Sequence, residues 1–202
     1  MPEKKRIFEE NITAESLIQR LILEFGSDSI SEGNTLTLSN EREEFEISGL
    51  PAVDVVKVKN PITEDHTCLR AYLMPSLIRI LRHNKNRDLP QKIFEVGYVI
   101  RDTLTVPHLC ALQAASRTSF TEIKSLTESV LREMRIEYTI EPCDYPTFLP
   151  GRGAIVRSEG KVLGIFGEMS PKCITDYGLT HPVMMMEMNL SDIIASRSGR
   201  LF

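Results

Sequence analysis

The sequence lacks several features that would indicate a membrane-bound, secreted or metal-dependent protein. Its 202 residues include no tryptophan, four cysteines and four histidines. The longest uncharged apolar candidate, residues 181–186, is far shorter than the about 20 residues of a membrane-spanning helix. The first residues carry several charges and no apolar segment, so we expect no signal peptide, no membrane association and a cytoplasmic location. A formal net charge of −4 gives no overall reason to bind nucleic acid.

The cysteines and histidines do not form a recognisable chemical motif. No C-x-x-C pair occurs, so the spacing of Cys68, Cys110, Cys143 and Cys173 does not predict a zinc site. Their apolar neighbours predict buried thiols in a reducing compartment. Motifs of metalloproteases, serine hydrolases and P-loop proteins are also absent. Side chains far apart in the sequence can still meet in the fold, but no local pattern predicts a catalytic residue or a metal ligand.

The hydrophobic patterns that are present predict an α+β domain. The helical spacing of apolar residues predicts four helices. They cover 13–26, Pro75 to Lys85, the residues that follow a Ser119–Glu122 capping box, and Ser170 to Gly178. Alternating or β-branched runs predict strands at 93–100, 108–114, 138–140, 154–156, 162–166 and 183–188. Short links join 93–100 to 108–114 and 154–156 to 162–166, and such links require antiparallel neighbours. We expect one domain over 13–194, after a loosely ordered segment 1–12 and before a flexible tail 195–202.

Three segments, taken in order, resemble one known family. The first is Asn60-Pro61-Ile62-Thr63-Glu64, followed by Leu69-Arg70, Leu73-Met74-Pro75-Ser76-Leu77 and Asn84. The second is Ile93-Phe94-Glu95-Val96-Gly97. The third is Phe148-Leu149-Pro150-Gly151-Arg152-Gly153, followed by Gly164-Ile165-Phe166-Gly167-Glu168-Met169-Ser170-Pro171. In order and spacing, they resemble the synthetase-like core of the phenylalanyl-tRNA synthetase β subunit in its archaeal and eukaryotic form.

The resemblance implies a class II aminoacyl-tRNA synthetase fold, with six or seven antiparallel strands flanked by helices. In that family the α subunit holds the active site, while the β core has lost the chemistry and helps to form a heterotetramer. The resemblance therefore implies the α subunit as partner, tRNA bound only indirectly through the complex, and ATP and Mg²⁺ only in the α subunit. In isolation, the apolar surface meant for that partner would favour a homodimer.

Arg101 is the one candidate for vestigial chemistry. It stands where the family's second-motif arginine would contact the ATP α-phosphate; the other interpretation is an exposed arginine beside Asp102 at a strand end. The C-terminal segment HPVMMMEMNLSDII has neither the glycine pair nor the arginine of the third motif. Because a reacting phosphoryl group needs both cationic clamps, we expect no catalytic residue and no adenylation. The alternative function is a free-standing paralogue that binds an amino acid or a nucleotide as a sensor.

The other motif residues are expected to have structural or interface roles. Glu95 either pairs with Arg70 in the interior or lies exposed on the sheet. Arg152 faces a phosphate or a partner carboxylate, or simply water. Gly97, Gly164 and Gly167 would allow close approach of another backbone or a helix inside strands. The basic region 79–92 is either a solvated helix face or a surface that contacts an acidic partner or tRNA. The run Met184-Met185-Met186 lies in the core or in a subunit interface. The same general expectation covers Asn60, Pro61, Leu69, Pro75, Asn84, Phe94, Pro150, Gly151, Glu168 and Pro171.

Overall fold

The computed structural model describes residues 32–33 and 37–191. The predicted helix over 13–26 and both predicted terminal segments, 1–12 and 195–202, lie outside the described residues. None of the helices within the described part is long and apolar enough to cross a membrane.

A seven-stranded sheet forms the centre of the domain, in the order β1-β4-β5-β9-β8-β7-β6. Every neighbouring pair is antiparallel except β1 and β4, which are parallel. Its strands are β1 (Glu32–Gly33), β4 (Gln91–Arg101), β5 (Leu104–Ala114), β6 (Thr139–Pro142), β7 (Phe148–Ser158), β8 (Lys161–Met169) and β9 (Val183–Asn189). A small second sheet pairs β2 (Leu38–Ser39) with β3 (Cys68–Leu69).

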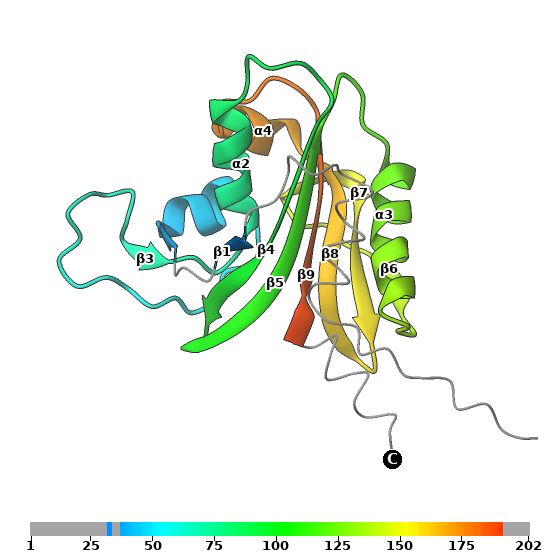
Figure 1. The fold of residues 1–202 in the computed structure, drawn as a ribbon, viewed down its shortest axis with the longest axis horizontal. Coiled ribbons are helices and arrows are strands. Elements are labelled where there is room, and N and C mark those ends of the chain that lie inside the picture. Colours follow the sequence, from blue (N-terminus) through cyan, green and yellow to red (C-terminus); the bar gives the residue numbers. More distant parts are fainter. Residues whose placement is uncertain (1–31, 34–36, 192–202) are drawn as a thin grey trace, which may run out of the picture.

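The helices lie on both faces of the large sheet (Figure 1). One face is covered by α2 (Met74–His83), α4 (Pro171–Asp176) and the short helix η2 (Arg42–Ile47); the other is covered by α3 (Phe120–Glu133). Residues along each strand alternate between two buried clusters: Met185 contributes to the α2 side, whereas Met184 and Met186 contribute to the α3 side. The predicted core role of the three methionines is therefore confirmed.

Most of the predicted elements are present, and the two predicted hairpins, β4–β5 and β7–β8, are antiparallel. All four cysteines are buried and free, as predicted. Pro171 begins α4, Ser170 caps it by accepting from the Cys173 N–H, and Gly178 follows with a φ of +77°. The predicted capping box is wrong. Ser119 is the N-cap residue of α3, but its side chain makes no capping hydrogen bond, and the Glu122 carboxylate accepts a hydrogen bond from the Gln113 amide instead.

Candidate functional site

Glu187 is the central polar group on the α2 face of the sheet. Its carboxylate accepts hydrogen bonds from the backbone N–H groups of Leu73 (2.9 Å) and Met74 (3.0 Å), where α2 begins. Nδ1 of His108 lies 2.8 Å from the same carboxylate and must carry the proton, because a carboxylate only accepts. The fixed carboxylate thus occupies the positive end of the α2 dipole. Burial by itself would raise the pKa of Glu187. The hydrogen bond and charge of His108, the hydrogen bond from the Leu73 N–H and the charge of Arg101 outweigh it, so the pKa of Glu187 lies below its usual value.

A second buried carboxylate, from Glu44 in η2, holds the residues just before α2. It accepts from the N–H groups of Ala71 (3.1 Å) and Tyr72 (2.9 Å). Burial raises the pKa of Glu44 to about 7, although hydrogen bonds from Ser39, Ala71 and Tyr72 oppose the rise. The negative charge of Glu187 adds to it. The segment that enters α2 is therefore fixed by two carboxylates from distant parts of the chain.

The predicted pair between Arg70 and Glu95 is present and buried, with 2.7 Å between Nη2 and Oε1. The Arg70 Nε also donates to the Tyr98 carbonyl at 3.0 Å. Gly97 makes room for this pair: a Cβ there would lie 2.7 Å from the Glu95 carboxylate and 2.8 Å from the Arg70 guanidinium. Side chains, not the backbone or helix that the sequence predicts, make the close approach at Gly97.

These groups align across the sheet. Strand pairing places Glu95, Cys110 and Glu187 opposite one another on β4, β5 and β9. Burial is the main reason that the pKa of Cys110 lies well above its usual value, and the neighbouring carboxylates raise it further. The Cys110 thiol therefore stays protonated, so this row supplies no thiolate nucleophile.

Arg101 ends β4 on the same face, and its guanidinium is engaged within the chain. The Nε donates to the Ala71 carbonyl at 3.2 Å, and the Cζ lies 4.2 Å from the centre of the Tyr72 ring. The next two residues, Asp102 and Thr103, both have positive φ, and Leu104 pairs directly with Arg101. Arg101 is half-buried rather than exposed, because the loop before α2 folds over it.

Glu168 and Arg152 meet at the start of α3. Glu168 accepts from the Phe120 N–H and the Thr118 hydroxyl, both at 2.9 Å, so it caps α3 in place of Ser119. Arg152 Nη1 lies 3.5 Å from Glu168, which makes a carboxylate within the chain the group that it faces. A Cβ at Gly167 would collide with the Arg152 carbonyl, and one at Gly164 with Met188, so both glycines allow the predicted close approach.

The remaining motif residues are dispersed over the fold. Asn60, Pro61, Pro150 and Gly151 are exposed, Asn84 is the C-cap of α2, and Leu69 belongs to β3. Pro75 is buried in the first turn of α2, and Phe94 is buried on the α3 side of the sheet. The structure therefore brings Arg70, Glu95 and Gly97 together, and separately Arg152, Gly167 and Glu168.

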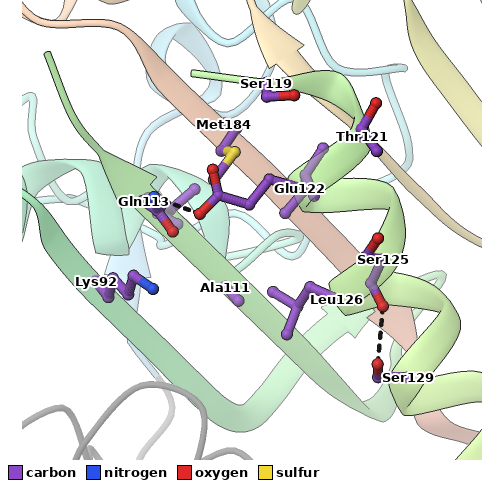
Figure 2. A pocket seen from close by; sticks show the side chains of 12 residues that line it. Lys92, Ala111, Gln113, Ser119, Thr121, Glu122, Ser125, Leu126, Ser129 and Met184 are labelled. Atoms are coloured by element: carbon purple, nitrogen blue, oxygen red, sulfur yellow. Dashed lines mark hydrogen bonds between the residues drawn. The ribbon is translucent and has the colours of Figure 1, made fainter. Parts of the chain in front are cut away.

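A groove of about 510 Å³ runs between α3 and strands β4, β5 and β9 (Figure 2). Gln113 and Glu122 are joined across it by a 3.0 Å hydrogen bond, and the Ser129 hydroxyl donates to the Ser125 carbonyl. Ala111 and Met184 form its floor on the α3 side of the sheet. The groove is thus on the opposite face from Arg101 and Glu187.

Sequence reasoning missed Glu44, His108 and Glu187 as a connected set. One signal was available for Glu187, because a single carboxylate stands inside the run Val183–Asn189, whose residues are otherwise mainly methionine. A charge on a buried strand needs partners. Its partners, however, lie 79 and 114 positions away along the chain, and no local pattern identifies them. In the part of the chain that the structure describes, no group of three metal-binding side chains occurs.

The fold is shared with an aminoacyl-tRNA synthetase of known structure. A solved pyrrolysyl-tRNA synthetase from Desulfitobacterium hafniense matches with a TM-score of 0.72 over 92% of this chain and 68% of that chain, at 15% sequence identity. The sheet is therefore that of the class II aminoacyl-tRNA synthetases. Residues 4–190 match the model of the phenylalanyl-tRNA synthetase β chain CLM domain, and the chain belongs to this family.

Curated relatives agree with the family. The phenylalanine–tRNA ligase β subunit of Methanosarcina barkeri is 40% identical over 78% of this chain and 29% of its own length. The corresponding subunit of Archaeoglobus fulgidus is 36% identical over 87% of this chain and 32% of its own length. The chain thus spans about a third of the length of the curated relatives it matches.

Proposed function

We propose that this chain is a non-catalytic core domain that assembles with the catalytic α subunit of a phenylalanine–tRNA ligase. The engagement of Arg101 by Ala71 and Tyr72 carries the proposal. An arginine that stabilises a reacting phosphate must present free donors to the ligand. Here Nε donates to the Ala71 carbonyl and the guanidinium lies against the Tyr72 ring, so contacts within the chain, not a ligand, fix the orientation of Arg101.

The tight β4–β5 hairpin supports the same conclusion. Two residues, Asp102 and Thr103, connect the strands, and pairing continues to Arg101 and Leu104 at the hairpin end. A two-residue turn leaves no loop that could fold over a nucleotide. The hairpin therefore offers a rigid end in place of a flexible clamp.

The buried acids support it further. Glu187 is bound by two backbone N–H groups and by His108. Glu95 pairs with Arg70, and Glu44 accepts hydrogen bonds from two further backbone N–H groups. These carboxylates act as internal anchors and do not form an open site for Mg²⁺, which retains several water ligands in most protein sites. The reaction of the complex, with its ATP and Mg²⁺, then belongs to the α subunit.

Assembly is tested by mixing the purified chain with the α subunit and measuring mass by light scattering. We expect a complex at micromolar concentration, and its absence contradicts the proposal. The chain alone is tested by phenylalanine-dependent pyrophosphate exchange, for which we expect no activity above background. A thermal shift with phenylalanine or ATP in the chain alone would favour the sensor alternative, because a ligand that binds only the native state raises the melting temperature.

A further inference from the structure

A groove of about 410 Å³ lies at the outer edge of the large sheet, beside β6 and the turn that joins β7 to β8. Strand pairing places Thr139 of β6 opposite Arg157 of β7, and Ser158 of β7 opposite Lys161 of β8. The groove is therefore built where three successive strands meet, at the edge of the sheet opposite β1.

The lining of this groove is acidic. It contains three carboxylates, from Glu137, Glu141 and Glu159, and one guanidinium, from Arg157, so its formal charge is −2. Arg157 pairs with Glu141, with 2.9 Å between Nε and Oε2. Because carboxylates only accept hydrogen bonds, the groove suits a ligand that carries N–H donors and positive charge.

Ser158 is the one buried residue in the lining and forms the floor of the groove. It is 5% exposed, and its hydroxyl oxygen has no hydrogen-bond partner within the described chain. Buried polar groups in folded proteins nearly always have a partner, and leaving one without it is costly. An N–H group bound in the groove would supply the partner that the Ser158 hydroxyl lacks.

Tyr138 adds an aromatic ring to the same groove and is half-buried. Burial is the main reason that the pKa of Tyr138 is raised, so its hydroxyl stays neutral near pH 7. The face of a tyrosine ring attracts an ammonium group and packs well against methylene groups. The groove therefore combines charge for a cation with an apolar surface for a hydrocarbon chain.

The carboxylates are spread along the groove. Within residues 32–33 and 37–191, no three acidic, histidine or cysteine side chains lie close enough together to hold one metal ion. Glu159 lies in the two-residue β7–β8 turn, where Glu159 and Gly160 have φ values of +50° and +79°, whereas Glu141 belongs to β6. Separated carboxylates match a ligand whose positive charges are distributed along a flexible chain.

We infer that this groove binds a linear polyamine. Its ammonium groups lie beside the carboxylates, one N–H donates to the Ser158 hydroxyl, and its methylene groups pack against the Tyr138 ring. The inference does not depend on assembly with an α subunit, because all of these side chains belong to this chain.

The test is isothermal titration calorimetry of the full chain with spermidine, at about 20 and 150 mM salt. The variant is Glu137→Gln/Glu159→Gln, and the matched control is Glu46→Gln/Glu64→Gln, which removes two exposed carboxylates elsewhere. We expect the variant to weaken binding about tenfold or more at low salt, because two charge-assisted contacts are lost, and the control to stay within about twofold. Binding by the unmodified chain should weaken at the higher salt concentration, since salt screens exposed charges.

Ser158→Ala separates a role in binding from a role in the fold. Because the hydroxyl has no partner within the described chain, its removal should leave the melting temperature unchanged or raise it, while spermidine binding weakens about threefold or more. A lower melting temperature with unchanged spermidine binding would make Ser158 structural and would overturn the inference.

Undetectable binding by the unmodified chain, or equal weakening in the variant and the control, also overturns the inference. Butylamine carries a single charge and should bind at least about tenfold more weakly than spermidine. Equal affinity for the two amines excludes a polyamine site, and so does displacement of spermidine by Mg²⁺ at an equal concentration of charge. Assembly with the α subunit is measured separately, so failure of one experiment leaves the other conclusion unaffected.

Discussion

Glu44 and Glu187 divide four consecutive backbone N–H groups between them: Glu44 holds Ala71 and Tyr72, and Glu187 holds Leu73 and Met74. These N–H groups precede or begin α2, where the helix itself provides no acceptors. A helix, a strand and a short η2 segment from distant parts of the chain are thereby fixed at one point. Carboxylates of the chain itself therefore occupy the end of α2 where an anionic ligand could otherwise bind, and they stabilise the fold.

Replacing Glu187 with glutamine removes the charge that His108 and the two N–H groups stabilise. We expect Glu187→Gln to lower the free energy of unfolding by about 3 kcal/mol, in the range for breaking a buried charged interaction. Urea denaturation monitored by circular dichroism measures the change. The control is Glu133→Gln at the exposed end of α3, which should alter stability by less than about 0.5 kcal/mol. Similar values for the two variants would show that Glu187 is not an anchor.

The Arg70–Glu95 pair should behave non-additively. Arg70→Met leaves the Glu95 carboxylate buried without its partner, at a cost of about 3 to 5 kcal/mol, whereas Arg70→Met/Glu95→Leu removes both charges and should be more stable than the single variant. A double-mutant cycle from thermal or urea unfolding measures the coupling. Additive effects within about 0.5 kcal/mol would mean that the two side chains do not interact.

The raised pKa of Glu44 predicts a stability that falls as pH rises. Its pKa is about 7 in the folded chain against an ordinary value of 4.5, so the folded state binds the proton more tightly. The stability from this group is full below pH 4.5 and is lost as pH rises through about 7. Between about pH 5 and 7.5 the loss is on the order of 2 kcal/mol.

Comparison with Glu44→Gln isolates this effect, because all other groups titrate in both proteins. We expect the wild-type chain to lose about 2 kcal/mol relative to the variant over that interval, measured by urea unfolding at each pH. Parallel pH profiles would contradict the assignment. Glu187, whose pKa is lowered, contributes in the opposite direction, with stability that is lost as pH falls below its usual pKa.

Arg101→Lys distinguishes a structural arginine from a catalytic one. Lysine keeps the charge but lacks the planar fork, so a catalytic clamp would lose about 100-fold or more in kcat. We expect the complex with the α subunit to keep its kcat for aminoacylation within about twofold, while the melting temperature of the chain falls because the contacts with Ala71 and Tyr72 weaken. A large loss of kcat in a folded complex would assign chemistry to Arg101.

The start of α3 offers a direct comparison of two capping groups. Glu168→Gln weakens the acceptor for the Phe120 N–H and should cost about 1 to 2 kcal/mol, whereas Ser119→Ala should cost less than about 0.5 kcal/mol. Both free energies come from the same denaturation experiment. A larger cost for Ser119→Ala would restore the capping box that the sequence predicts.

Local sequence patterns were enough to predict most of the helices and strands and the family. Proline at the start of α2 and α4, the period of the apolar residues and the short hairpin links are local signals, and they placed most helices and strands. The strand β7 (Phe148–Ser158) is nevertheless much longer than the predicted 154–156. The Arg70–Glu95 pair was also within reach, because a glutamate between apolar strand residues requires a cation.

The roles of the polar groups depend on contacts between distant parts of the chain, which the sequence patterns do not show. Arg101 is engaged because the loop before α2 crosses the end of β4, and Glu168 replaces Ser119 as the cap because β8 passes beside α3. Hydrogen bonds and electrostatic fields depend on distance in space, and contacts across 79 or 114 positions leave no periodic trace in the sequence.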